Sequence, residues 1–219
     1  MKQKLSLMIV LGLLLSLVSG LATAGPNANS KILLNVRTTT QANNHPCTDP
    51  AASPSSCAAI STNGKLIGPN APGQYIYLLV EEANGVSSMD CGINFSGTGQ
   101  SFFSWNLCAD NDTTTTGWQT GGNRITWDTC QTGPVICAGY FYCGVYSPCQ
   151  LLVVGDPVNG LAVVTACDTT QVDNITGHDV SHMGYVNFSA GAVTPGYNPC
   201  GLVTPTSITT WGAIKSTFR

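Results

Sequence analysis

The sequence predicts an all-β protein, a single antiparallel β-sandwich held together by disulfide bonds. Short apolar or alternating runs follow one another along the 219 residues, separated by Gly, Pro, Asn and Asp and without a long helical pattern. The chain contains ten cysteines, and all of them follow an N-terminal export signal. An even number of cysteines behind such a signal is typical of a disulfide framework, because exported proteins fold in oxidising compartments.

Residues 1–24 have the three parts of a secretory signal peptide. Lys2 and Lys4 form the basic start, residues 5–18 form an apolar run, and the small-residue ending Ala22-Thr23-Ala24 precedes Gly25. The apolar run is too short for a stable membrane span. We therefore expect a secreted or cell-surface protein whose mature part begins at Gly25 and has no membrane span.

Composition narrows the range of partners. The formal net charge is −3 and only 9% of residues are charged. Nucleic acids and anionic lipids bind clusters of Lys and Arg, and this chain has too few for either. The expected partner is an extracellular protein, a glycan or another copy of the chain.

The first half of the chain predicts three strands and one irregular excursion. Residues 31–38 form the first strand, and residues 37–73 form an excursion rich in Pro, Ser and Asn. Residues 74–82 form the second strand, Asn84-Gly85 is a turn signal, and residues 86–95 alternate as a third strand. In this third strand one face carries apolar side chains: Met89, Cys91, Ile93 and Phe95.

The second half predicts six further strands and a tail. The strands are residues 101–108, 124–130, 135–146, 151–154, 161–167 and 184–188. Residues 25–200 then form one domain, followed by a Thr/Pro-rich linker over residues 201–210. Residues 211–219 place Trp211, Ile214 and Phe218 on one face of a short amphipathic helix. That tail is either a docking or sorting tag or a segment that packs on its own domain.

Strand spacing restricts how the cysteines pair. Cys137 and Cys143 lie six residues apart in one predicted strand, about 20 Å when extended, whereas a disulfide needs Cα atoms within about 7 Å. These two cannot bond to each other unless that strand is broken. The local pairings expected are Cys47–Cys57, Cys108–Cys130 and Cys167–Cys200. Four cysteines then pair among themselves: Cys91, Cys137, Cys143 and Cys149.

Aromatic residues suggest one candidate ligand face. Tyr140, Tyr142 and Tyr146 have the same parity in the strand 135–146, opposite to Cys137 and Phe141. An exposed row of tyrosines, together with Trp118, is a platform for a glycan or a partner protein. The alternative is that the tyrosines fill one layer of the sandwich.

Two further clusters have the residue types of metal sites. Asp110-Asn111-Asp112 is an oxygen-rich loop that would suit a structural calcium ion, and a capped turn explains it equally well. His178 and His182 have the i, i+4 spacing of a zinc pair, but they lack the glutamate and the helical context of a metalloprotease. Two loop histidines are the alternative. No other cofactor is expected.

No motif predicts catalysis, and no catalytic residue is assigned. The chain has three histidines and no Gly-x-Ser-x-Gly elbow for a nucleophilic serine. Glu81 and Glu82 are neighbours on a strand, so they face opposite sides and cannot act as an acid/base pair. The sequence therefore favours a non-catalytic extracellular binding, adhesion or surface-structural module. The alternatives are a carbohydrate-binding module using the aromatic face, a secreted hydrolase, and a subunit of an extracellular fibre or coat.

Two resemblances support this interpretation. The stretch QYIYLLVEEANGVSSMDCGINF over residues 74–95, followed by FFSWNLC, WDTC and GPVICAGYFYCGVYS, resembles the strand sequences of cohesin-type extracellular jelly-roll sandwiches. This resemblance covers residues 31–167 and implies a jelly-roll, cohesin-like or immunoglobulin-like sandwich. No dockerin-binding face can be carried over residue by residue.

The second resemblance is to an uncharacterised family of secreted proteins from uncultured bacterial lineages. The segment Gly196-Tyr197-Asn198-Pro199-Cys200 and the ending TWGAIK over residues 210–215 carry it, and the family's W-x-L-C, I-T-W and G-Y-F-Y occur in the same order. The resemblance implies a secreted location and a fold, but it does not point to an activity. The cysteines at 91, 137, 143 and 149 are additional to the family's usual set.

Overall fold

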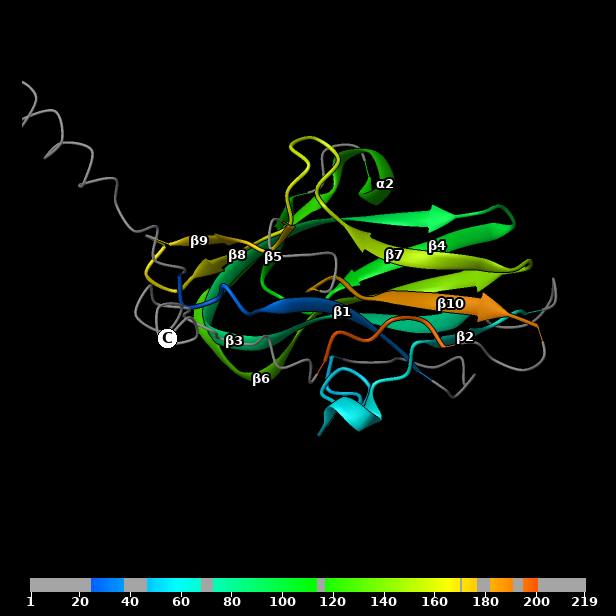
Figure 1. The fold of residues 1–219 in the computed structure, drawn as a ribbon, viewed down its shortest axis with the longest axis horizontal. Coiled ribbons are helices and arrows are strands. Elements are labelled where there is room, and N and C mark those ends of the chain that lie inside the picture. Colours follow the sequence, from blue (N-terminus) through cyan, green and yellow to red (C-terminus); the bar gives the residue numbers. More distant parts are fainter. Residues whose placement is uncertain are drawn as a thin grey trace, which may run out of the picture.

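The structure is a computed structural model that describes residues 25–37, 47–67, 73–113, 117–169, 171–176, 182–190 and 195–200. It shows the predicted β-sandwich, which is largely antiparallel, although β10 pairs parallel with β2 (Figure 1). The strands are β1 (Lys31–Val36), β2 (Asn63–Lys65), β3 (Gln74–Ser96), β4 (Gln100–Leu107), β5 (Asn111–Thr113), β6 (Asn123–Val145), β7 (Cys149–Val154), β8 (Val163–Ala166), β9 (Val172–Asn174) and β10 (Tyr185–Ser189). The helical elements are the 3-10 turn η1 (Cys57–Ala59) and the short helix α2 (Trp118–Gly121). Among the described residues, no helix is long and apolar enough to cross a bilayer.

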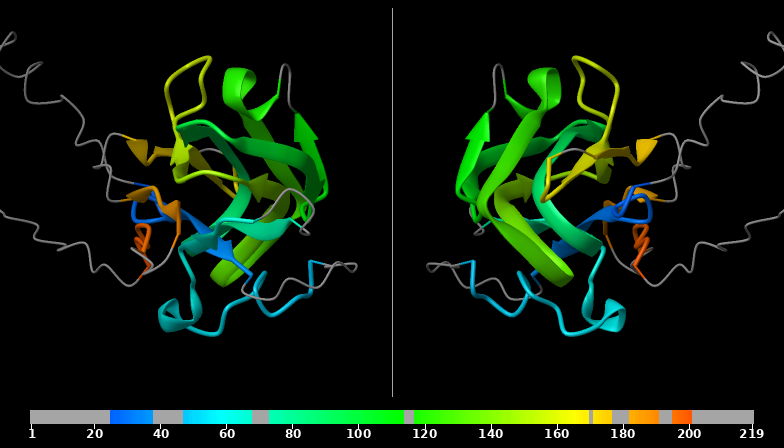
Figure 2. Two further views of the ribbon diagram at one scale, coloured as in Figure 1. Left: turned by 90° about the vertical axis from the view of Figure 1, so that its right-hand side faces the viewer. Right: turned by 90° about the vertical axis from the view of Figure 1, so that its left-hand side faces the viewer.

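Two long curved strands connect the two layers. β3 and β6 have 23 residues each and pair antiparallel along most of their length. The first part of β3 also pairs with β1, whereas its last residues, Gly92–Ser96, pair with β7. The hydrogen-bonded order β2-β10-β7-β3-β6-β4 therefore runs continuously from one layer to the other. Figure 2 shows how these bent strands wrap around the interior.

The structure joins two pairs of strands that were predicted as separate. Residues 74–82 and 86–95 belong to one strand, and Gly85, with φ of 80°, lies at a register shift between Ala83 and Val86. The predicted strands 124–130 and 135–146 likewise form the single strand β6, with φ of 150° at Gly133. A β-bulge uses the same glycine conformations as a tight turn, so a turn signal in the sequence fits both.

A further irregularity changes which side chains share a face. Leu78 pairs with Gly139, and the next residue, Leu79, pairs with Cys137, so Ala138 is the extra residue of a bulge. Cys137 consequently lies on the same side of the sheet as Tyr140. The predicted grouping of Cys137 with Phe141 is wrong for this reason.

The apolar side chains form two clusters on opposite faces of the β3–β6 pair. The main core lies between the layers and includes the predicted row Met89, Cys91, Ile93 and Phe95, all of them buried. A smaller outer cluster is formed by Leu33, Ala52, Tyr77 and Leu79. Ala52 belongs to the excursion that was expected to be irregular, so part of that segment covers the outer face of the sheet.

Three disulfides join distant parts of the chain. They are Cys47–Cys108, Cys57–Cys200 and Cys130–Cys167, with sequence separations of 61, 143 and 37 residues. The six cysteines are those expected in the local pairings, but all three pairings are different. The correction has a topological cause, because curved strands bring segments together that are far apart in sequence.

The other four cysteines are free in the structure, which corrects the expectation that they pair among themselves. Cys91, Cys143 and Cys149 belong to the main core, whereas Cys137 packs against the outer cluster. The sheet itself therefore separates Cys137 from the other three. Cys137 and Cys143 both lie in β6, as predicted, and do not bond to each other.

Because these free thiols are buried, we expect the free energy of unfolding to fall at alkaline pH. Burial raises the pKa of Cys137 and of Cys143 to about 12, against an ordinary value of 9.0. A raised folded-state pKa contributes stability that is fully present below pH 9 and is lost as the pH rises toward 12. Between pH 8 and pH 10 we expect urea unfolding to show a loss of about 1 kcal/mol for each of these thiols. The Cys143→Ala variant should lose about 1 kcal/mol less over the same interval; an equal loss in both proteins would contradict the assignment.

Candidate functional site

Four tyrosines gather on the outer face of the β3–β6 pair. Tyr75 pairs with Tyr142 across the strands, and Tyr77 pairs with Tyr140. The ring centroids of Tyr75 and Tyr142 lie 4.8 Å apart, those of Tyr75 and Tyr140 5.8 Å, and those of Tyr77 and Tyr140 5.5 Å. Tyr77 is fully buried, and the other three are half-buried, so they form an aromatic surface over a closed base. We call Tyr75, Tyr140 and Tyr142 the tyrosine face.

Tyr75 and Tyr140, two members of the tyrosine face, are uncharged at neutral pH. Burial raises the pKa of Tyr75 and Tyr140, and the nearby Arg37 charge offsets only part of the effect at Tyr75. The hydroxyl of Tyr142 accepts a hydrogen bond from the Gly73 amide at 2.8 Å. Arg37 is itself neutralised, because its Nε lies 3.1 Å from Asp49 Oδ2. The surface therefore offers aromatic rings and neutral hydroxyl groups to a ligand.

A pocket of about 350 Å³ opens on the same side of β6. Its lining includes Ala52, Val135 and Cys137, which also pack in or against the outer cluster beneath the tyrosines. The remaining wall is mostly polar and consists of Ser53, Asp110, Thr129, Gln131 and Thr132, with Trp127, Ile136 and the Cys47–Cys108 disulfide. The outer face of the β3–β6 pair thus combines an aromatic surface with a polar hollow.

The predicted ligand residues divide into three groups. Tyr140 and Tyr142 belong to the tyrosine face. Tyr146 follows the end of β6 and is 40% exposed, and in the described part of the chain no ring contact joins it to the other tyrosines. The prediction that Trp118 belongs to the ligand face is wrong. Trp118 is 8% exposed and packs edge-on against Trp105 and Phe141 in the main core, with centroid distances of 4.8 and 5.1 Å.

Tyr75 and Tyr77 were not among the residues predicted for the candidate face. Both alternate correctly in QYIYLL, so the signal of a shared face was present. What the sequence does not contain is the register that places them opposite Tyr142 and Tyr140.

The predicted calcium loop is part of a hydrogen-bonded strand arrangement. Asp110 Oδ2 accepts the Asp128 amide at 2.7 Å, and Asn111 Nδ2 donates to Asp128 Oδ1 at 3.2 Å. Asp112 Oδ2 accepts from Trp105 Nε1 at 2.9 Å and from Asn123 Nδ2 at 3.1 Å. These bonds hold β5 against its neighbours, and calcium binding at this loop stays a prediction.

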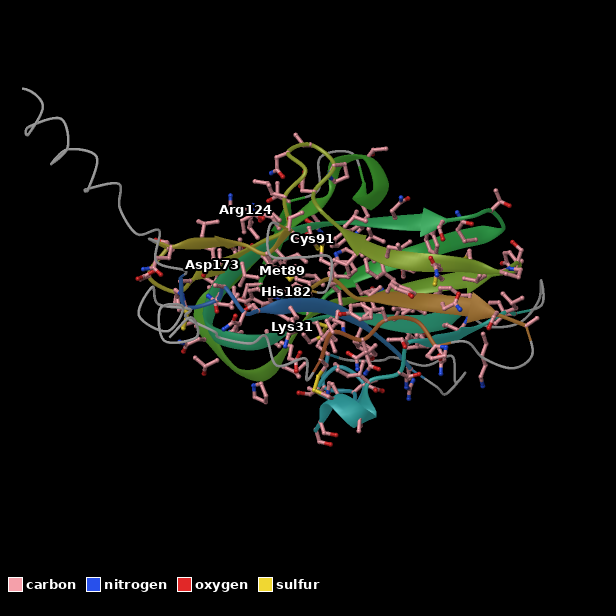
Figure 3. All side chains as sticks on the ribbon, viewed as in Figure 1. Lys31, Met89, Cys91, Arg124, Asp173 and His182 are labelled. Carbon is pink, nitrogen blue, oxygen red and sulfur yellow. A yellow bond between two sulfur atoms is a disulfide. The ribbon has the colours of Figure 1, made fainter. Side chains whose placement is uncertain are left out.

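The other predicted sites are only partly covered by the structure. His182 is buried, and its Nδ1 lies 3.2 Å from the carbonyl oxygen of Ser30 (Figure 3). His178 lies outside the described residues, so the zinc pair stays a prediction. The linker 201–210 and the tail residues Trp211, Ile214 and Phe218 also lie outside them, as does the signal peptide.

A buried ion pair lies beside one disulfide. Glu81 Oε2 is 3.8 Å from Lys31 Nζ, and both side chains are at most 7% exposed. Glu81 Oε1 lies 3.1 Å from the sulfur of Cys57 and 2.7 Å from that of Cys200. Among the described residues, Cys57, Glu81 and Cys200 are the three whose potential metal-ligand atoms lie within 4.8 Å of one another. Their two sulfurs are joined in a disulfide, and metal-binding cysteines are thiolates, so we interpret this cluster as structural.

Comparison with known proteins adds one distant structural likeness. No protein-family model matches the chain, and no curated protein matches it. A cohesin module from a family 33 glycoside hydrolase of Clostridium perfringens superposes with a TM-score of 0.42 and 8% sequence identity. The superposition covers 73% of this chain and 98% of that module.

Proposed function

We propose that this protein is a non-catalytic extracellular binding module whose ligand lies on the outer face of the β3–β6 pair. The observation that carries the proposal is the tyrosine face, because half-buried aromatic rings on paired strands are fixed in position and still accessible. The adjoining pocket supplies polar groups that can orient a ligand. Three disulfides support an extracellular location, where such bonds persist.

The chemistry of this surface favours a neutral glycan. Sugar rings present an apolar face of C–H groups that packs on an aromatic ring, and their hydroxyls hydrogen-bond to neutral polar side chains. The tyrosine face and the pocket provide both kinds of contact. A strongly anionic ligand would need free Lys or Arg, whereas Arg37 is already paired with Asp49.

Tyrosine substitutions test this function. Wild-type protein is screened on a glycan array, and the best ligand is measured by calorimetry against the Tyr140→Ala/Tyr142→Ala double variant. Because this variant removes two of the three accessible rings, we expect its affinity to fall about tenfold or more. Melting curves show whether the double variant still folds.

Tyr146→Ala is the matched control. Tyr146 is exposed and directly follows β6, but it lies outside the tyrosine face. This variant should therefore bind as the wild type does. Equal losses in both variants would place the ligand elsewhere. No glycan bound by the wild type would rule out the glycan proposal and leave a protein partner to be sought.

A further inference from the structure

The N-terminal residues of the described chain are anchored to a buried carboxylate. Gly25 donates its backbone N–H to Asp173 Oδ1 at 2.8 Å, and Asn27 donates its own to Asp173 Oδ2 at 2.8 Å. Asp173 is 7% exposed and lies in β9, 148 residues further along the chain. Figure 3 shows Asp173 beside the N-terminal segment that leads into β1.

The segment around this contact is built into the protein. Asn27 is fully buried, its Nδ2 donates to the carbonyl of Gly85 at 3.1 Å, and its Oδ1 accepts the Asn84 amide at 2.9 Å. The Ala28 amide donates to the carbonyl of Gly25 at 3.2 Å. Residues 25–28 therefore form a turn that is fixed at both Asp173 and the bulge of β3.

The absence of a side chain at position 25 lets the backbone approach Asp173 closely. A Cβ atom placed on Gly25 would lie 2.5 Å from each carboxylate oxygen of Asp173, closer than such atoms approach. With any other residue here, either the Asp173 carboxylate or the Gly25 segment would have to shift. Gly25 is also the residue that follows the small-residue ending Ala22-Thr23-Ala24 of the predicted signal peptide.

Both the Asp173 contact and the small-residue ending concern the peptide bond between residues 24 and 25. We propose that the signal peptidase hydrolyses this peptide bond and that the new α-ammonium of Gly25 forms an ion pair with Asp173. Water adds across the bond, so that Ala24 leaves with a carboxylate and Gly25 keeps its nitrogen as an ammonium group. The Asp173 carboxylate, which faces a neutral amide before cleavage, then faces a positive charge at the same position.

Asp173 is suited to receive this charge. Ion pairs between described residues include Lys31–Glu81, Arg37–Asp49 and Arg124–Asp90, and Asp173 is not a member of these pairs. A charged donor strengthens a hydrogen bond to a carboxylate, and a partly buried pair is screened less than one in water. Export processing therefore completes the anchoring of the mature N-terminus. This inference is independent of the proposed ligand face.

The test compares two N-termini in the oxidised protein. One protein begins at Gly25 and the other at Ala24, so that the second keeps the amide and lacks the charge at residue 25. Each is made with Asp173 and with Asp173→Asn. At pH 7 we expect the melting temperature of the Gly25 form to be about 2 to 4 °C higher than that of the Ala24 form. The difference should vanish in the Asp173→Asn pair.

The pH dependence gives a second signature. An α-amino group has an ordinary pKa of about 8, and a neighbouring carboxylate raises it. The stabilisation is then fully present below pH 8 and is lost as the pH rises through the raised folded-state value. The advantage of the Gly25 form should therefore disappear at high pH. Each pair is compared at one pH, so the effect of the buried thiols cancels.

Two direct measurements keep the proposal testable if the Asp173→Asn variant fails to fold. Mass spectrometry of the exported protein should give Gly25 as the first residue. Nuclear magnetic resonance of the ¹³C-methylated α-amine should show a higher pKa in the folded protein than in urea. A different first residue, an unchanged pKa, or equal melting temperatures for the two N-termini would each overturn the proposal.

Discussion

The Glu81→Leu variant is expected to lose about 3 to 5 kcal/mol of unfolding free energy. The substitution leaves the Lys31 ammonium group buried without the carboxylate that lies 3.8 Å away. Lys31 side-chain exposure is 1%, so solvent screens little of the charge that the carboxylate had balanced. The measurement is equilibrium unfolding in urea with the disulfides intact.

The matching double variant separates the ion pair from simple packing. Lys31→Met/Glu81→Leu replaces both charges with apolar side chains of similar size, and such replacements are often close to neutral. We expect the double variant to recover most of the stability that Glu81→Leu loses. If the two substitutions were instead simply additive, the two charges would not be coupled and the pair would not act as the geometry implies.

Removal of the Cys57–Cys200 disulfide is the second large effect. The loop that it closes spans 143 residues, and constraint of so long a loop in the unfolded chain is worth about 5 kcal/mol in the loop-entropy account. Measured losses for native disulfides range from about 2 to 5 kcal/mol. The Cys57→Ala/Cys200→Ala variant should therefore unfold at much lower urea concentration than the wild type.

The Cys130–Cys167 disulfide provides the comparison. It closes a loop of 37 residues, so the same account gives a loss about 1 kcal/mol smaller for Cys130→Ala/Cys167→Ala. Both double variants are measured by urea unfolding under identical conditions. A larger loss from the shorter loop would show that contacts of the disulfides in the folded state outweigh chain entropy.

Local patterns in the sequence were sufficient for the fold class and for most strands. Alternation identified the inward face at Met89, Cys91, Ile93 and Phe95, because one side of a half-buried strand must be apolar. The same patterns could not distinguish a hairpin turn from a bulge at Asn84-Gly85. Both need a glycine with positive φ, and only the pairing with β6 decides between them.

The disulfide pairings and the candidate site depend on long-range register. Cys57 and Cys200 meet because the C-terminal segment returns beside the excursion, and no local spacing encodes that return. Tyr140 and Tyr142 were identifiable from parity in one strand. Their partners on β3 were not, because strand order is a property of the whole sheet.

Trp118 shows a different limit. A tryptophan among Gly, Thr and Gln resembles an exposed loop residue in sequence, yet helix α2 turns its ring into the main core. Its burial depends on the rings of Trp105 and Phe141, which strands distant in sequence bring together.

Residues 47–57 are the part of the excursion that is held at both ends by disulfides, through Cys47–Cys108 and Cys57–Cys200. Because Cys47, Ala52 and Ser53 form one wall of the pocket, that wall cannot swing open to admit a ligand. Association should then be a single second-order step whose observed rate rises linearly with ligand concentration. Reducing agents would free the wall and introduce a slower, concentration-independent phase in stopped-flow traces.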